Sequence, residues 1–256
     1  MSTTVIFLGT GTSQGIPIIG CDHPVCLSND LKDKRLRVSI WIKTQKTSVV
    51  IDCGPDFRTQ MLRSNCQKID GILFTHEHAD HTAGFDDIRP FYFKQGPINI
   101  YAEDRVLNNL KKRFDYIFEK NNRYPGAPEV IENKLSENRS FTIGDLTLEP
   151  IRCLHGKLPI FGFLFNEIVY LTDIKTIAQD QMDKIKFCKV LILSCIRHEA
   201  HPMHFNLKEA LEFSRQIKAQ TTYLTHISHL LGFHQEIQSK LPENVFLAYD
   251  NFSIQT

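Results

Sequence analysis

Three histidines and one aspartate fall within six positions of the segment GILFTHEHADH, residues 71–81. In an extended segment alternate side chains share a face, so His76 and His78 point the same way. Asp80 and His81 come round at the following turn. Imidazole nitrogen and carboxylate oxygen suit zinc, manganese and iron, and a catalytic ion keeps one coordination position open. Four ligands are too many for one open site, so the spacing predicts two neighbouring ions.

The alternative is that these are solvated turn residues. Packing three imidazoles and a carboxylate together has a large desolvation cost unless a cation uses them, which favours the metal interpretation. Suitable partners also end later strand-like segments. They are His155 in IRCLHG, Asp173 in VYLTD and His226 in YLTH.

Such a pair of ions indicates hydrolysis. Two cations about 3.5 to 4 Å apart can share a water, lower its pKa to near neutrality and hold the hydroxide in line with an electrophile. The same charges neutralise the oxyanion that develops on a phosphorus or carbonyl centre. No side-chain nucleophile is required.

Short β-type segments separated by turn residues must position these side chains. Residues 39–52 and 161–173 each predict a hairpin, because apolar runs flank a short polar step, so the sheets should be largely antiparallel. Helical periodicity covers 105–120, 177–186, 207–219 and 234–241, and Asn206 is the expected N-cap of the third helix. The expected strands are 4–8, 38–43, 48–52, 71–74, 98–101, 146–151, 161–165, 168–171, 190–194 and 222–225.

Length and composition indicate an ordinary globular protein. The 256 residues are 42% hydrophobic and predict one domain over 1–256, with a loop-rich insertion near 119–138 at the site mouth. Because the 30 basic residues are balanced by 29 acidic ones, duplex nucleic acid is not an expected partner.

No charged leader or membrane-length apolar run is present, which favours a cytoplasmic location. Seven scattered cysteines argue against a disulfide framework.

The histidine motif, with the isolated residues at later strand ends, resembles the metallo-β-lactamase superfamily from residue 4 to about residue 250. The resemblance implies an α+β, four-layered αβ/βα sandwich with two mixed, mostly antiparallel sheets and the site on their shared edge. It also gives Asp80 a catalytic role. By this resemblance the first metal is held by His76, His78 and His155, the second by Asp80, His81 and His226, and Asp173 bridges them.

Two other segments carry open alternatives. In FLGTGTSQGIP, residues 7–17, the glycines suit either a phosphate-binding turn or a tight turn packed under the metal site. In GCDHPVC, Cys21, His23 and Cys26 are spaced for a structural zinc site at 21–26, with His229 as the candidate fourth ligand. The alternative for the cysteines is that they are simple buried thiols.

His204 in MHFNLKEAL lies at the start of an expected helix and is not needed by either metal. A histidine there is suited to protonate a leaving oxygen or bind a phosphate, given its reference pKa of ~6.5. The alternative is an ordinary surface histidine. His198 and His201 nearby fit that second description better, and the alternative is that either of them assists at the site.

Together the glycine-rich turn, the cysteine segment, His204 and THISH resemble the phosphoribosyl 1,2-cyclic phosphate phosphodiesterase subgroup. The resemblance implies a dinuclear site for a small cyclic phosphodiester, a separate structural zinc and a homodimer. The chain departs from the subgroup by having His23 where a third cysteine is expected.

Three other functions are also compatible with the sequence. One is a tRNA 3′-processing endonuclease of the same superfamily, opposed by the balanced charge and the lack of a long basic arm. Another is a thioester hydrolase of glyoxalase type, which leaves His204 and the cysteine segment unexplained. The third is a metal-binding protein without turnover, opposed by a ligand set that leaves room for substrate.

Overall fold

The two sheets at the centre of the molecule contain several strands that are buried and apolar along nearly their whole length. In β3 (Ser48–Ile51), Val50 packs toward helices while Val49 packs toward the other sheet. In β10 (Ile168–Leu171), Tyr170 likewise faces the other sheet. A strand covered on both faces needs apolar side chains at every position, so its sequence does not alternate.

The computed structural model describes residues 2–121 and 123–256. Its first sheet has the order β15-β1-β2-β3-β4-β5-β6 and is antiparallel from β15 to β3 and parallel from β3 to β6. The remaining strands of this sheet are β1 (Thr4–Gly9), β2 (Ser39–Lys43), β4 (Gly71–Leu73), β5 (Ile98–Ala102), β6 (Val130–Lys134) and β15 (Ser253–Gln255).

The second sheet has the order β11-β8-β9-β10-β12-β13-β14, with β7 paired to β8. It is antiparallel from β11 to β10 and parallel from β10 to β14. Its other strands are β7 (Phe141–Ile143), β8 (Leu146–His155), β9 (Leu158–Phe165), β11 (Thr176–Ile177), β12 (Val190–Ser194), β13 (Thr221–Thr225) and β14 (Val245–Leu247).

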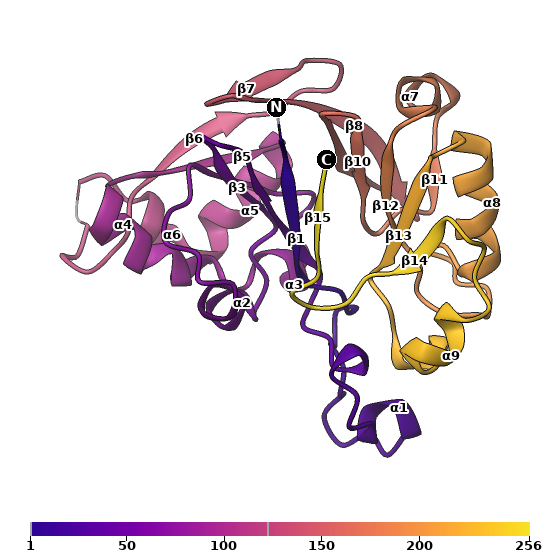
Figure 1. Cartoon of the computed structure of the whole chain (residues 1–256). Helices are drawn as coiled ribbons and strands as arrows, with labels where there is room; N and C mark the ends of the chain where they lie inside the picture. Colours follow the sequence, from indigo (N-terminus) through magenta and orange to yellow (C-terminus); the bar gives the residue numbers. More distant parts are fainter. Residues whose placement is uncertain (1, 122) are drawn as a thin grey trace.

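Helices cover the outer face of each sheet (Figure 1). On the first sheet lie α2 (Phe57–Arg63), α4 (Arg89–Gln95), α5 (Asp104–Arg113), α6 (Asp115–Phe118) and the 3-10 turn η2 (Phe85–Ile88). On the second lie α7 (Gln179–Ile185), α8 (Leu207–Ile217) and α9 (His234–Gln238). Three apolar clusters separate these layers, one between the sheets and one under each set of helices. The layers are those of the predicted αβ/βα sandwich.

Local predictions and the structure differ at three places. The sheets are mixed as predicted, but half of each is parallel, because the chain crosses over through helices after β3 and β10. The helix expected over 105–120 breaks at Phe114 into α5 and α6. Within the expected loop 119–138, residues 130–134 form the edge strand β6, whose polar exposed side chains hid it from an apolar pattern. Residue 122 of that loop lies outside the described residues.

Both predicted hairpins form, as β2–β3 and β9–β10. At the second, Asn166 and Glu167 both have positive φ, the backbone of a tight two-residue turn. The predicted cap of α8 also forms, since the Asn206 side chain accepts from the N–H of Glu209 and the Glu209 side chain accepts from the N–H of Asn206. None of the described helices has the length and apolar character needed to cross a membrane.

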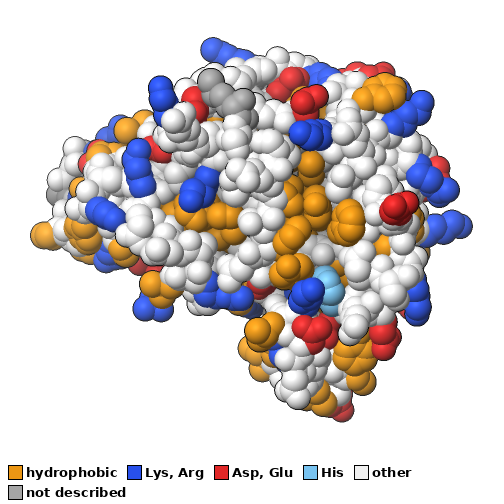
Figure 2. Space-filling model, viewed as in Figure 1, with side chains coloured by type: hydrophobic (Ala, Val, Ile, Leu, Met, Phe, Trp, Pro, Cys, Tyr) orange, Lys and Arg blue, Asp and Glu red, His pale blue; other side chains and the backbone are white. Residues whose placement is uncertain are grey.

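A small lobe, residues 17–34, projects from the body below β1 (Figure 1). It contains α1 (Pro24–Leu27) and the turn η1 (Leu31–Asp33), and an antiparallel bridge between Ile16 and Arg35 closes its neck. Hydrophobic side chains gather on its surface in Figure 2. One residue of this lobe, Ile19, is fully exposed. The turn η3 (His229–Leu231) packs beside it.

Candidate metal centre

The predicted donors meet where strands of both sheets end. His76 and His78 lie in the loop after β4, and Asp80 and His81 lie in the short helix α3 (Ala79–Thr82) that follows it. The second sheet supplies its donors from three further strand ends. His155 ends β8, Asp173 follows β10 and His226 follows β13.

Three histidines form the first donor group. His76 Nε2 and His78 Nδ1 lie 3.0 Å apart, so the two rings present different nitrogens to one point. One nitrogen of His155 lies within 4.8 Å of both. His76 and His155 are buried, whereas His78 is exposed, which leaves this group open on one side.

Two carboxylates and two imidazoles form the second group, in which the four donor atoms lie within 4.8 Å of one another. His81 Nε2 lies 3.2 Å from Asp173 Oδ2 and 3.3 Å from Asp80 Oδ2. His226 Nε2 lies 3.2 Å from Asp173 Oδ1. Asp173 therefore uses both oxygens toward this group.

Asp173 also joins a third group with His155 and His204, again within 4.8 Å. Since His155 belongs to the first group, the Asp173 carboxylate lies between the two predicted ion positions. That is the place from which a bridging ligand acts. The structure thus brings together all seven side chains that the sequence singled out for metal binding.

The electrostatics of the cluster call for added positive charge. Burial alone raises the pKa of Asp173, but the neighbouring imidazoles of His226 and His81 outweigh it and hold that pKa well below its ordinary value. Burial lowers the pKa of His81, but Asp80 and Asp52 reverse this and raise it well above the ordinary value. Two ionised buried carboxylates thus draw positive charge inward, and a divalent cation supplies it without a proton.

The unpaired nitrogens point to the same conclusion. His81 Nε2, His226 Nε2 and His204 Nδ1 are buried and make no hydrogen bond among the described residues, although Asp173 oxygens lie 3.2 to 3.5 Å from them. Buried polar atoms are rarely left without a hydrogen bond, so these imidazole nitrogens are free to bind a metal ion. The donor set therefore fits a pair of divalent ions.

Sequence reasoning missed the residues that orient these ligands. Asp52, fully buried at the end of the hairpin, lies 2.7 Å from His81 Nδ1 and accepts from the N–H and hydroxyl of Thr75. The Met203 carbonyl lies 2.9 Å from His155 Nδ1. Such contacts fix which nitrogen faces the metal. The available signal was the aspartate of SVVID, which ends a strand paired to the one before the histidine motif.

The backbone of the site is strained at its ligand-bearing turns. Asp52, Asp173 and His226 have φ values of 67°, 56° and 54°, in the left-handed region that disfavours side chains other than glycine. Asp52 and His226 directly follow the ends of β3 and β13, and Asp173 lies two residues after the end of β10. This conformation directs the side chain back over the sheet edge. The backbone strain therefore occurs where it brings side chains into the site.

His204 is buried against the donors. Its Nδ1 lies 3.5 Å from Asp173 Oδ1, and its ring centre lies 4.5 Å from that of His155. Burial, followed by the charge of His226, lowers the pKa of His204 to about 3. The surroundings therefore favour the neutral imidazole, which acts as a hydrogen-bonding group, over the protonated acid that the reference pKa of ~6.5 suggests. His201 lies beside it, and His198 is exposed.

The glycine-rich turn is packed by its own backbone. The amides of Gly11, Thr12, Gly15 and Ile16 donate to backbone carbonyls. A side chain on Gly9 would meet the Arg37 carbonyl at 2.0 Å. These amides are therefore occupied, and the structure supports the tight-turn interpretation over the phosphate-binding one.

The cysteine segment occupies the projecting lobe. Cys26 is buried, and the rings of His23 and His229 lie 4.8 Å apart in an edge-to-face contact. His23 Nδ1 accepts from the N–H of Val25 at 3.3 Å and caps α1. Among the described residues, the donor atoms of Cys21, His23, Cys26 and His229 form no group of three within 4.8 Å. A structural zinc here stays a prediction.

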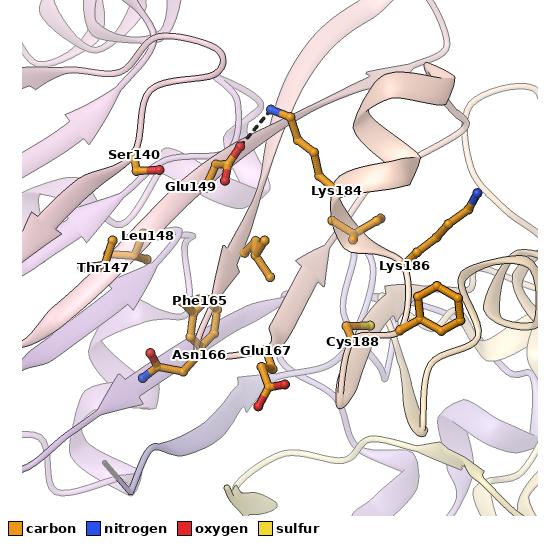
Figure 3. Close-up of a pocket in the computed structure, with 13 residues that line it drawn as sticks. Ser140, Thr147, Leu148, Glu149, Phe165, Asn166, Glu167, Lys184, Lys186 and Cys188 are labelled. Atoms are coloured by element: carbon orange, nitrogen blue, oxygen red, sulfur yellow. Dashed lines mark hydrogen bonds and ion pairs between the residues drawn. The ribbon is translucent and has the colours of Figure 1, made fainter.

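An open hollow of about 400 Å³ lies away from the metal centre (Figure 3). It is lined by the turn after β9 and by the end of α7, and Lys184 pairs there with Glu149 at 2.8 Å. That turn is at the opposite end of the strands from Asp173. The hollow is therefore separate from the site.

The comparisons with known proteins agree with this geometry. Residues 47–227 match the family model described as "Beta-lactamase superfamily domain". The chain belongs to the metallo-β-lactamase superfamily. A solved structure described as a new diphosphatase from the PhnP family is 36% identical, covers 100% of this chain and 98% of its own, and superposes with a TM-score of 0.93. The superfamily assignment and fold class predicted from the sequence are confirmed.

Two curated relatives extend further than this chain. An octanoyltransferase of Porphyromonas gingivalis is 39% identical over 96% of this chain but only 50% of its own length. A ribonuclease Z of Bradyrhizobium diazoefficiens is 26% identical over 61% of this chain and 48% of its own. The chain spans about half the length of these relatives. Its fold and donor set are those of a metal-dependent hydrolase, and the activity of the whole protein is a proposal.

Replacing the shared carboxylate tests the pairing of the ions. We expect Asp173→Ala to weaken metal binding by at least about 10- to 100-fold, the cost of losing a supporting contact, because the second group loses a donor and the proposed bridge to the first group is lost. The measurement is metal content after dialysis against a calibrated chelator. Glu236→Ala, an exposed acid of α9, is the control and should bind metal normally. Unchanged metal content in Asp173→Ala would rule out the bridging role.

Replacing a thiol tests the lobe separately. Cys21→Ser should remove one zinc per chain and lower the Tm by several degrees, since a small lobe with few buried residues depends on such a ligand. Asp22→Asn, an exposed neighbour, is the matched control. Equal zinc content and equal Tm for both variants would show that the thiols are not ligands.

Proposed function

We propose that this domain hydrolyses a small phosphodiester, with a cyclic phosphodiester such as phosphoribosyl 1,2-cyclic phosphate as the leading substrate. The observation that carries the proposal is the Asp173 carboxylate, which lies between a three-histidine group and a carboxylate-imidazole group. Likeness to a PhnP-family diphosphatase over the whole chain supports the phosphate chemistry.

The proposed ligands divide as the sequence predicted, with His76, His78 and His155 on one side, Asp80, His81 and His226 on the other, and Asp173 shared. Zinc, manganese and iron all suit these donors. When bound, the two ions would supply an activated water and positive charge for the oxygens of the five-coordinate phosphorus in the transition state. Overall, one P–O bond to water forms and one P–O bond to the leaving oxygen breaks.

The protein groups around the donor set orient the metal ligands and the substrate. Asp52 and Met203 hold two of the imidazoles in the orientation that leaves their second nitrogen free. His204, as a neutral imidazole beside Asp173, is placed to donate an N–H to the leaving or non-bridging oxygen of the substrate. The exposed side of the first group, at His78, is the direction from which substrate enters.

A diphosphate linkage is the second candidate substrate. It is favoured by the described activity of the 36% identical relative. A diphosphate carries the same phosphorus centre with a better leaving group, so the same residues serve. The balanced charge and the absence of a long basic arm in the sequence speak for small substrates over precursor tRNA, despite the ribonuclease Z relative.

A substrate panel distinguishes these possibilities. The holoprotein should release product from cyclic ribosyl phosphates or from sugar and nucleoside diphosphates at least 100-fold faster than from precursor tRNA or thioesters. Octanoyl thioesters belong in the panel because of the octanoyltransferase relative. Preferred turnover of a thioester would refute the proposal. No turnover of any compound by fully metal-loaded protein would favour a binding protein without catalysis.

The role of His204 has its own test. His204→Ala should keep its metal content and lower kcat by about 10²- to 10⁴-fold, most severely for substrates with poor leaving groups. His198→Ala, an exposed histidine of the same loop, is the control and should retain the normal rate. Loss of one ion in His204→Ala would instead show that His204 is a metal ligand.

A homodimer and a cytoplasmic location stay predictions.

A further inference from the structure

A cluster of buried charged side chains lies outside the metal centre and has no part in the proposed mechanism. Arg35 is only 3% exposed, and Asp250 and His234 are buried beside it. Arg35 Nη1 donates to Thr10 Oγ1 at 2.8 Å and to the Ala248 carbonyl at 2.6 Å, and its Nη2 lies 3.2 Å from His234 Nδ1. An arginine is seldom buried at this level unless its hydrogen bonds fix something.

Thr10 connects this cluster to the site. Its hydroxyl donates to Asp250 Oδ1 at 2.8 Å, while its carbonyl accepts from the N–H of Ile227 at 2.9 Å. The N–H of Thr12 donates to the Ile227 carbonyl at 3.3 Å. Both backbone groups of the residue after His226 are therefore held by the glycine-rich turn, and the side chain of Thr10 anchors that turn to the buried charges.

His226 needs such support more than the other imidazoles do. The outer nitrogen of His81 faces Asp52, and that of His155 faces the Met203 carbonyl. His226 Nδ1 has no hydrogen-bond partner among the described residues. Its backbone is also in the left-handed region, a conformation that persists only where the surroundings impose it. The backbone therefore constrains the direction of the His226 ring, together with its stacking on His204 at 4.9 Å between ring centres.

We propose that Thr10 and Arg35 are positioning residues for His226: they fix the turn that holds Ile227 and so keep the His226 ring directed at the second ion position. This rests on the proposed metal centre. The two residues touch no donor side chain, and their effect passes through the backbone. The glycine-rich turn then has a function that is neither phosphate binding nor general packing.

The test is a conservative pair of variants at Thr10. Thr10→Val keeps the shape but removes the hydroxyl that bonds Arg35 and Asp250, whereas Thr10→Ser keeps the hydroxyl. Cobalt is titrated into metal-free protein, and the two binding steps are followed by the visible absorption of the bound ion. In Thr10→Val we expect one step to weaken by about 10- to 100-fold, the usual cost of losing an orienting contact, with the other unchanged. Thr10→Ser should restore both steps.

A control separates positioning from stability. Thr222→Val removes a comparable buried hydroxyl, which lies 2.6 Å from Ser214 Oγ beneath α8. It should lower the Tm as Thr10→Val does and leave both cobalt steps intact. If Thr10→Val does not fold, Arg35→Lys takes its place, because a lysine keeps the charge but cannot contact Thr10, Ala248 and His234 together.

Each outcome decides the question. Selective weakening of one step in Thr10→Val or Arg35→Lys, absent from Thr222→Val, supports the proposal. Two normal steps in the Thr10 or Arg35 variant, or the same weakening in Thr222→Val, overturns it while the metal centre stands. Fewer than two steps in the unaltered protein would overturn the dinuclear centre and this inference together.

Discussion

The Asp173 carboxylate is the contact on which both halves of the site depend. Its two oxygens face His81 and His226, and it shares a donor group with His155. These partners come from both sheets, so the carboxylate is also where the two sheets are joined electrostatically. Burying an ionised carboxylate has a desolvation cost. The arrangement is stable only if the attraction between the carboxylate and the positive charges around it is larger than that cost. The composition of the whole edge follows from that balance.

The backbone carries much of the cost of this arrangement. A parallel strand brings its carboxyl end to the sheet edge, and a left-handed residue one or two positions beyond that end turns its side chain back across the edge. Asp173 and His226 use this turn after β10 and β13, both preceded by the residues Leu-Thr. The paired strands beneath them are buried on both faces, and their stability offsets the conformational cost of the strained residues.

Sequence patterns predicted the ligands better than their supports. The motif from His76 to His81 is local, so its chemistry can be read without knowing the fold. Asp52 escaped notice because its role depends on β3 lying beside β4, a parallel pairing that no local pattern reports. For the same reason the sheets were expected to be more antiparallel than they are. His204 was found from its position before a helix, but its pKa depends on His155, His226 and burial, which only the folded chain reveals.

The division of each sheet into antiparallel and parallel halves explains where chemistry occurs. Antiparallel strands alternate in direction, so any one edge receives the ends of only some of them, and that half contributes a single donor, His155. Parallel strands bring all their carboxyl ends to the same edge, where the loops before the next helices are free to carry polar side chains. The opposite edge receives tight turns, such as the one after β9 in Figure 3, whose residues close hairpins and cannot converge. The sheet topology therefore determines which edge can carry a converging set of side chains, whatever residues occupy that edge.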